Sequence, residues 1–161
     1  IIAFKDNQIV DRLGFFPECL EPSFLLDLRI DLAENRVNQR RISFEGSADL
    51  PRINPAYNGR PYRYFYAVKF EKDRHLVMKW DTQKNTPLFW SQKNCFAGEP
   101  VFIQNPLGSG REDDGVILSL ILDANEKISF LLILDAKNLK ELARVPLLFS
   151  VPYGLHGQFY K

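Results

Sequence analysis

The chain has 161 residues, which is enough for one ordinary domain with a hydrophobic core. Hydrophobic residues make up 45% and charged residues 25%, and the net charge of +1 gives no reason to expect nucleic acid or an anionic membrane as a partner. No apolar run reaches the roughly 18 residues of a membrane span. Aromatic residues are frequent at 13%, which favours strands.

The two cysteines, Cys19 and Cys95, have no metal-binding spacing. A disulfide between them is possible, but two reduced thiols in a cytosolic protein are the favoured interpretation. The sequence begins at Ile1 without an initiator Met, and we interpret it as a fragment whose N-terminus is missing. A cytoplasmic location is expected, while membrane association and a mitochondrial location stay open because the missing N-terminus leaves targeting unjudged.

The first elements in chain order are an irregular segment and a hairpin. Residues 1–23 mix short apolar runs with glycine and proline, which predicts irregular structure. Apolar and charged residues then alternate over 24–32, the period of a half-buried strand, and residues 37–44 can return antiparallel after a turn at Asn35. A loop rich in proline and asparagine follows over 46–59.

The remainder predicts further short strands with turns between them, over 62–68, 75–80, 86–92, 99–104, 116–122, 128–134 and 142–145. The run 116–122 is the expected inner strand, buried on both faces. No helical period of useful length occurs, so the fold class is all-β. Sandwich, barrel and propeller all fit this pattern, and the successive three- and four-strand meanders favour propeller blades.

Two histidines are candidates for metal chemistry. His156 lies between Gly154 and Gly157, and a neutral imidazole is the commonest protein ligand for a transition metal. A lone histidine near such a terminus is nevertheless more often a surface or packed residue than a ligand. His75 follows the charged run 72–74 at a strand start, so we expect it to be solvent-exposed and not a ligand.

An acidic run and a set of three arginines are interpreted as structural rather than functional. Glu112-Asp113-Asp114 lacks the spacing of a calcium loop, which predicts a polar turn in which Gly115 supplies unusual backbone angles. Arg52, Arg60 and Arg63 are interpreted as paired surface charges.

Three groups of short motifs follow one another in a defined order. The first is Asp-Leu-Pro-Arg-Ile-Asn-Pro at 49–55 with Gly-Arg-Pro-Tyr-Arg-Tyr at 59–64, and the second is Gly-Glu-Pro-Val-Phe-Ile at 98–103 with Glu-Asp-Asp-Gly-Val at 112–116. The third is Leu-Leu-Ile-Leu-Asp-Ala at 131–136, Glu-Leu-Ala-Arg-Val at 141–145 and Pro-Tyr-Gly-Leu-His-Gly at 152–157. Together they resemble the C-terminal third of the carotenoid cleavage oxygenases, a family that includes beta-carotene oxygenases and the retinoid isomerohydrolase.

The resemblance implies that residues 1–161 are a single incomplete domain, the C-terminal part of a seven-bladed β-propeller. It also implies a non-haem ferrous iron, Fe(2+), on the propeller axis, bound by four histidines. The family's last iron ligand falls on His156, and the other three belong to segments upstream of Ile1. Acidic residues that hydrogen-bond ligand histidines fall on Glu99 and on Asp49, where the family usually has a glutamate.

The implied activity, in the full-length parent only, is cleavage of a carbon–carbon double bond of a carotenoid or apocarotenoid with O2, giving aldehyde or ketone products. Retinyl-ester isomerohydrolysis with the same iron and a non-enzymatic β-domain that binds apolar ligands are the alternatives. Phe102 and Tyr153 could line an apolar substrate channel, although core packing is favoured for any single aromatic. Any peripheral membrane contact is expected through segments outside this chain.

Overall fold

The computed structural model describes residues 2–4, 23–152 and 156–160. These residues form strands and turns with one short 3-10 helix, η1 (Pro55–Tyr57), so the all-β fold class is confirmed. No helix among them is long and apolar enough to cross a membrane. The chain divides into two compact units, Ile1–Asp49 and Leu50–Lys161, with the boundary inside strand β4 (Ser47–Arg52). The expectation of a single incomplete domain stays a prediction.

The first unit contains the predicted hairpin. Strands β1 (Ile2–Phe4), β2 (Ser23–Asp31) and β3 (Arg36–Ile42) form an antiparallel sheet in the order β1-β2-β3. Asn35 takes the left-handed conformation at the hairpin turn, with φ of 49°. Burial is confined to the beginning of β2, and β3 is exposed along most of its length, so the predicted half-buried strand extends over only part of the hairpin. Most of segment 1–23 lies outside the described residues.

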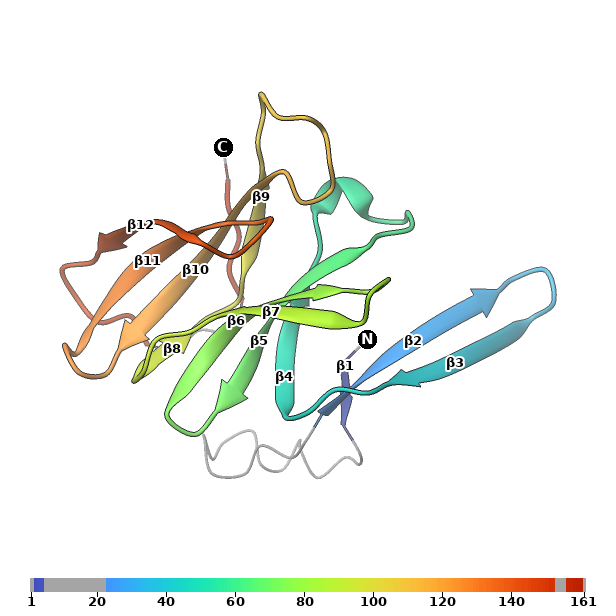
Figure 1. The fold of residues 1–161 in the computed structure, drawn as a ribbon, viewed down its shortest axis with the longest axis horizontal. Helices are drawn as coiled ribbons and strands as arrows, with labels where there is room; N and C mark the ends of the chain where they lie inside the picture. Colours follow the sequence, from blue (N-terminus) through green and yellow to red (C-terminus); the bar gives the residue numbers. More distant parts are fainter. Residues whose placement is uncertain (1, 5–22, 153–155, 161) are drawn as a thin grey trace. The chain divides into compact units, whose positions relative to one another are not determined.

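The strands from β4 onward form one sheet, shown in Figure 1. Its order is β12 (Glu141–Pro146), β11 (Ile128–Asp135), β10 (Gly115–Asp123), β8 (Cys95–Ala97), β6 (Arg74–Asp81), β5 (Tyr64–Glu71) and β4. In addition, β7 (Thr86–Trp90) pairs with β6, and β9 (Val101–Gln104) pairs with β10. All the predicted strands therefore occur, although β7 and β9 are shorter than expected and β8 was not predicted. Strand β4 was not predicted either, because it lies in residues 46–59, which were expected to be a loop, and β1 lies in the segment expected to be irregular.

Two successive meanders organise this sheet. Strands β5, β6 and β7 are antiparallel neighbours, and so are β9, β10, β11 and β12. The short strand β8 connects them, because it pairs parallel with β6 and antiparallel with β10. Consecutive antiparallel meanders of this size are the pattern of propeller blades, as the sequence predicted.

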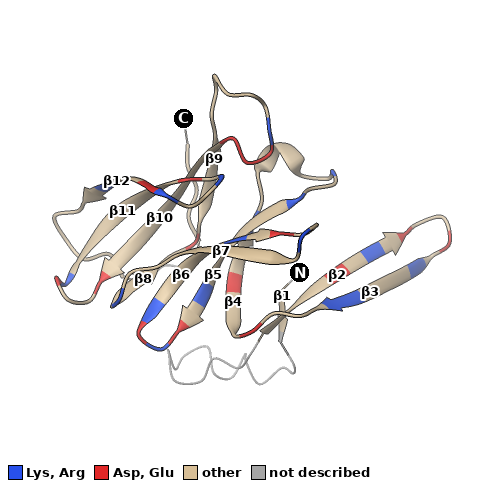
Figure 2. Cartoon of the chain, viewed as in Figure 1, with Lys and Arg blue, Asp and Glu red and all other residues tan. Residues whose placement is uncertain are grey.

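The core of the second unit lies along the inner strands. Residues that are nearly inaccessible include Tyr66, Val77, Ile117, Ile121, Leu132 and Leu134. Figure 2 shows that charged residues lie only at the ends of β10 and β11. Burial along β10 alternates between full and partial, so the prediction of complete burial on both faces was wrong for one face. Leu120 and Leu122 on that face line a pocket with the C-terminal segment.

The acidic turn before β10 ties neighbouring segments together. Glu112 accepts backbone hydrogen bonds from Arg63 and Tyr64, with donor–acceptor distances of 2.6–3.0 Å. Asp113 pairs with Lys79 Nζ at 2.7 Å. Asp114 accepts hydrogen bonds from Ser109, and these hold its pKa well below the usual range. The polar-turn interpretation is therefore confirmed.

Gly115 serves a different purpose from the one predicted. It is absent from the described residues with positive φ, so it does not supply an unusual backbone angle. A Cβ at this position would instead lie 2.2 Å from the Ile103 carbonyl oxygen and 2.8 Å from the Phe102 ring. Glycine is required here because β9 approaches the backbone closely.

Candidate functional site

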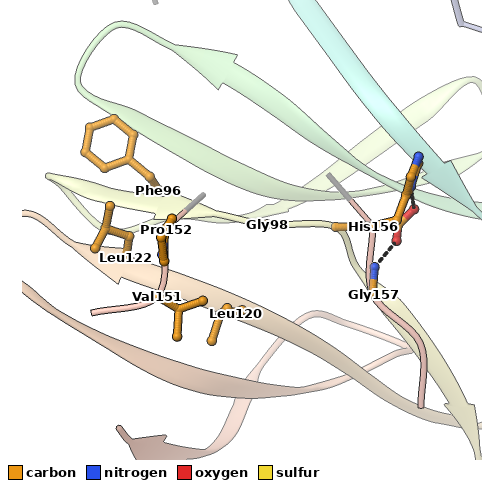
Figure 3. Close-up of a pocket in the computed structure, with 9 residues that line it drawn as sticks. Phe96, Gly98, Leu120, Leu122, Val151, Pro152, His156 and Gly157 are labelled. Atoms are coloured by element: carbon orange, nitrogen blue, oxygen red, sulfur yellow. Dashed lines mark hydrogen bonds and ion pairs between the residues drawn. The ribbon is translucent and has the colours of Figure 1, made fainter. Parts of the chain in front are cut away.

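The C-terminal segment returns His156 to the loop between β8 and β9. Its Nδ1 lies 3.2 Å from Oε1 of Glu99, and the backbone N–H of Gly157 donates to Glu99 Oε2 at 2.9 Å. Dashed lines in Figure 3 mark both interactions. The His156 side chain is 76% exposed, whereas that of Glu99 is 4% exposed. The structure thus brings together two of the three residues singled out by the sequence.

The loop that carries Glu99 is held on β10 by its neighbour Gly98. The Gly98 N–H donates to the Leu120 carbonyl at 2.8 Å, and the Ser119 hydroxyl donates to the Gly98 carbonyl at 2.8 Å. A Cβ on Gly98 would lie 3.1 Å from the same Leu120 oxygen, so the approach is tight. Glu99 therefore extends from a fixed piece of backbone rather than from a loose turn.

Arg52, the last residue of β4, also reaches this pair. Its Nε lies 3.6 Å from Glu99 Oε1. One terminal nitrogen donates to the Gly157 carbonyl at 2.9 Å and to Gln158 Oε1 at 3.0 Å. Arg52 is a paired charge, as predicted, but its partner is a buried carboxylate rather than a surface one.

A pocket of about 100 Å³ opens beside His156. Figure 3 shows Phe96, Leu122 and Val151 at one end of it and His156 with Gly157 at the other. The remaining lining residues are Gly98, Glu99, Leu120 and Pro152. The lining of this pocket is thus mostly apolar. Tyr153, proposed from the sequence as a channel residue, lies outside the described residues, and Phe102 packs in the core against Tyr66 with ring centroids 5.9 Å apart.

The third candidate, Asp49, lies on β4 and is partly buried. It is the last residue of the first unit, whereas Glu99 and His156 belong to the second. Its assignment as the partner of another ligand histidine stays a prediction. Within the described part of the chain, no group of three or more His, Cys, Asp or Glu side chains is arranged to hold a metal ion.

The prediction that His75 is solvent-exposed was wrong. Its side chain is buried, with the residue 3% exposed, and its ring makes edge contacts with Phe70 and Phe96 at centroid distances of 4.8 and 5.0 Å. The reason is that β6 is an inner strand, so both rings come from directly paired positions on β5 and β8. Burial lowers the pKa of His75 to about 4, although a backbone hydrogen bond with Ala97 acts in the opposite direction.

Cys95, like His75, is buried and is not a candidate for metal binding or catalysis. It is a free thiol with no exposed surface, and burial raises its pKa to about 11. Cys19, the other cysteine, lies outside the described residues.

The arrangement around His156 suits a metal ligand held by a carboxylate. With Nδ1 directed at Glu99, the Nε2 side of the ring is available for a metal, and the carboxylate fixes the ring tautomer and orientation. The sequence singled out His156 and Glu99 as candidates but did not single out Arg52 and Ser119, which hold Glu99 and its loop. Arg52 lies in the Leu-Pro-Arg-Ile-Asn motif beside Asp49, which was the one available signal, whereas nothing local in the sequence distinguishes Ser119.

Comparison with known proteins places these features in context. The family described as retinal pigment epithelial membrane protein matches residues 4–161. Beta,beta-carotene 15,15'-dioxygenase of Mus musculus is 44% identical over 124 residues, which cover 75% of this chain and 22% of the relative. The mitochondrial carotenoid-cleaving dioxygenase of Mustela putorius furo is 43% identical over 122 residues, which cover 71% of this chain and 22% of the relative.

Solved structures agree with these sequence matches. A cobalt-substituted Synechocystis ACO superposes with a TM-score of 0.79 and 32% identity, covering 88% of this chain and 31% of that one. A mutant of Synechocystis apocarotenoid oxygenase gives a TM-score of 0.77 and 33% identity, covering 85% and 30%. The chain therefore spans about a fifth of the length of the curated relatives and less than a third of the solved ones.

Proposed function

The chain belongs to the carotenoid oxygenase family that includes retinal pigment epithelial membrane protein, and we propose that the protein containing it cleaves a carbon–carbon double bond of a carotenoid or apocarotenoid with O2. The products would be aldehydes or ketones. Relatives named as carotene or carotenoid dioxygenases support cleavage over ester isomerohydrolysis. The Nδ1–carboxylate contact between His156 and Glu99 supports an iron site, which both reactions would use.

His156 is proposed to be one ligand of an Fe(2+) ion, through Nε2. An Fe(2+) ion held by neutral nitrogen ligands with an open coordination position can bind O2 beside an electron-rich alkene. Glu99 accepts the Nδ1–H of His156, which fixes the tautomer that leaves Nε2 unprotonated. The apolar lining formed by Phe96, Leu120, Leu122 and Val151 suits a hydrocarbon chain beside His156.

One imidazole cannot hold an iron ion by itself, so the other three histidine ligands are proposed to come from segments that precede Ile1 in a longer protein. Asp49 is proposed to accept a hydrogen bond from one of them, directly or through a water. The 161 residues alone should bind no stoichiometric iron, and metal analysis that finds one tightly bound iron per chain would contradict this. A cytoplasmic location stays a prediction, and one relative is named mitochondrial.

The proposal is tested on the full-length protein with three substrates, namely beta-carotene, an apocarotenoid and a retinyl ester, each with O2 and under nitrogen. We expect O2-dependent formation of aldehyde or ketone products from the carotenoid or the apocarotenoid. Release of isomerised retinol from the ester, without O2 dependence, would instead establish isomerohydrolysis. If no substrate is converted although iron is bound, the enzyme proposal fails and the binding-domain alternative remains.

A further inference from the structure

We propose that Arg52 is a positioning residue that fixes both His156 and Glu99 for metal binding. The inference rests on the proposed function, because it assigns a role toward the same iron. The sequence alone did not distinguish Arg52 from Arg60 and Arg63, and all three were interpreted as paired surface charges.

The charge of Glu99 needs a partner. Its carboxylate is 4% exposed, and a carboxylate that is buried to this extent needs a cationic partner to offset its lost hydration. A neutral His156 imidazole does not itself carry that charge. Among the described residues, Arg52 is the lysine or arginine within 4.0 Å of Glu99, with its Nε 3.6 Å from Oε1.

The backbone next to His156 is held by the same two side chains. The Gly157 N–H donates to Glu99 Oε2 at 2.9 Å, and the Gly157 carbonyl accepts from Arg52 at 2.9 Å. Both backbone polar groups of the residue that follows His156 are therefore held, one by each member of the Arg52–Glu99 pair. The same Arg52 nitrogen also donates to Gln158 Oε1 at 3.0 Å.

These contacts link three separate parts of the second unit. Arg52 ends β4, Glu99 lies between β8 and β9, and Gly157 belongs to the C-terminal segment. Because glycine gives the segment little stiffness of its own, the guanidinium, with several donors in a fixed plane, determines where the His156 backbone lies. Loss of Arg52 should loosen the ligand without removing it.

The test compares Arg52→Met with Arg63→Met in the full-length oxygenase. Arg63 is a matched control, because its side chain is 33% exposed against 35% for Arg52 and it also loses a carboxylate partner, Asp81 at 2.7 Å. Each variant is titrated with Co(2+), and the visible absorption band of the bound ion is recorded. Amide hydrogen exchange at Gly157 is measured without metal.

We expect Arg52→Met to bind Co(2+) about 10- to 100-fold more weakly than the wild type, the range typical of lost support for a metal ligand, with an altered band. Gly157 exchange should accelerate about tenfold or more, since its carbonyl loses the Arg52 donor and Glu99, which accepts its N–H, loses its cation. Arg63→Met should keep the wild-type affinity within about twofold even if its thermal stability falls.

Wild-type affinity, band and Gly157 protection in Arg52→Met would overturn the inference. If Arg52→Met does not fold, Arg52→Lys decides, because one ammonium keeps the charge near Glu99 but lacks the planar fork. A Co(2+) affinity of Arg52→Lys between those of the wild type and a protein without this support would support the positioning role of Arg52. An affinity equal to that of the wild type would contradict it. If the wild-type protein itself binds no metal, the proposed function fails. Faster Gly157 exchange in Arg52→Met would still establish that Arg52 fixes the backbone next to His156.

Discussion

His156 Nδ1 lies 3.2 Å from Glu99 Oε1 although the two residues are 57 positions apart in the chain. Replacing Glu99 with Gln preserves size but leaves one oxygen for two donors, the His156 ring and the Gly157 N–H. We expect Glu99→Gln to weaken Fe(2+) or Co(2+) binding by about 10- to 100-fold, measured by titration of the full-length protein. Glu126→Gln, at an exposed turn, is the control and should bind normally.

His75 makes stability depend on pH. Because its pKa is about 4 when folded and about 6.5 when unfolded, the unfolded chain binds an extra proton between these values. The contribution of His75 to the free energy of unfolding is therefore fully present above about pH 6.5 and decreases as the pH falls toward 4. At about pH 5 we expect unfolding to cost about 2 kcal/mol less than at about pH 7.5.

Denaturant unfolding of His75→Leu at the two pH values isolates this contribution. The variant should lose most of that pH dependence, because it has no imidazole to protonate. An unchanged difference in unfolding free energy between the two pH values would show that His75 is not responsible.

Gly115 should tolerate no side chain. A methyl group would meet the Ile103 carbonyl oxygen at 2.2 Å and the Phe102 ring at 2.8 Å, and backbone atoms cannot move aside cheaply. We expect Gly115→Ala to destabilise the chain by about 1–3 kcal/mol, as other over-packed sites do, measured by the thermal unfolding midpoint. Gly157→Ala is the control, since its nearest contact would be an ordinary 3.9 Å, and an equal loss in both variants would contradict the explanation.

Lys79 and Asp113 form a buried ion pair between β6 and the acidic turn. The Lys79 side chain is 4% exposed, and its ammonium also lies 4.0 Å from the ring centroid of Tyr64. We expect Lys79→Met to cost about 3–5 kcal/mol, because it leaves Asp113 without its cation. Adding Asp113→Leu should recover part of this loss in a denaturation experiment, and further destabilisation in the double variant would exclude an ion-pair effect.

Much of the fold followed from the sequence because alternation and turn residues are local signals. The hairpin over β2 and β3, the strands β5, β6, β10 and β11 and the tight turns between them were predicted for that reason. Strand β8 was missed because three residues carry too little pattern, and its pairing with both β6 and β10 is a long-range property. The exposure of His75 was predicted wrongly for the same reason, since its burial depends on rings from two other strands.

The site was predicted less completely than the fold. His156 and Glu99 came from ordered motifs that resemble a family, and their proximity could not have been worked out from spacing. Arg52 looked like one of several surface arginines, because the sequence does not show that β4 ends beside the Glu99 loop. Asp49 stays a prediction, since the proposed partner belongs to a segment that this chain does not contain.

The iron content of two histidine variants tests the central claim most directly, because His156 and His75 are the two histidines of this chain. Full-length protein carrying His156→Ala or His75→Leu is purified under identical conditions and its metal content measured. If His156 is a ligand, His156→Ala should retain almost no iron, while His75→Leu should retain about one ion per protein, as the wild type does. A wild-type iron content in His156→Ala would contradict the ligand assignment.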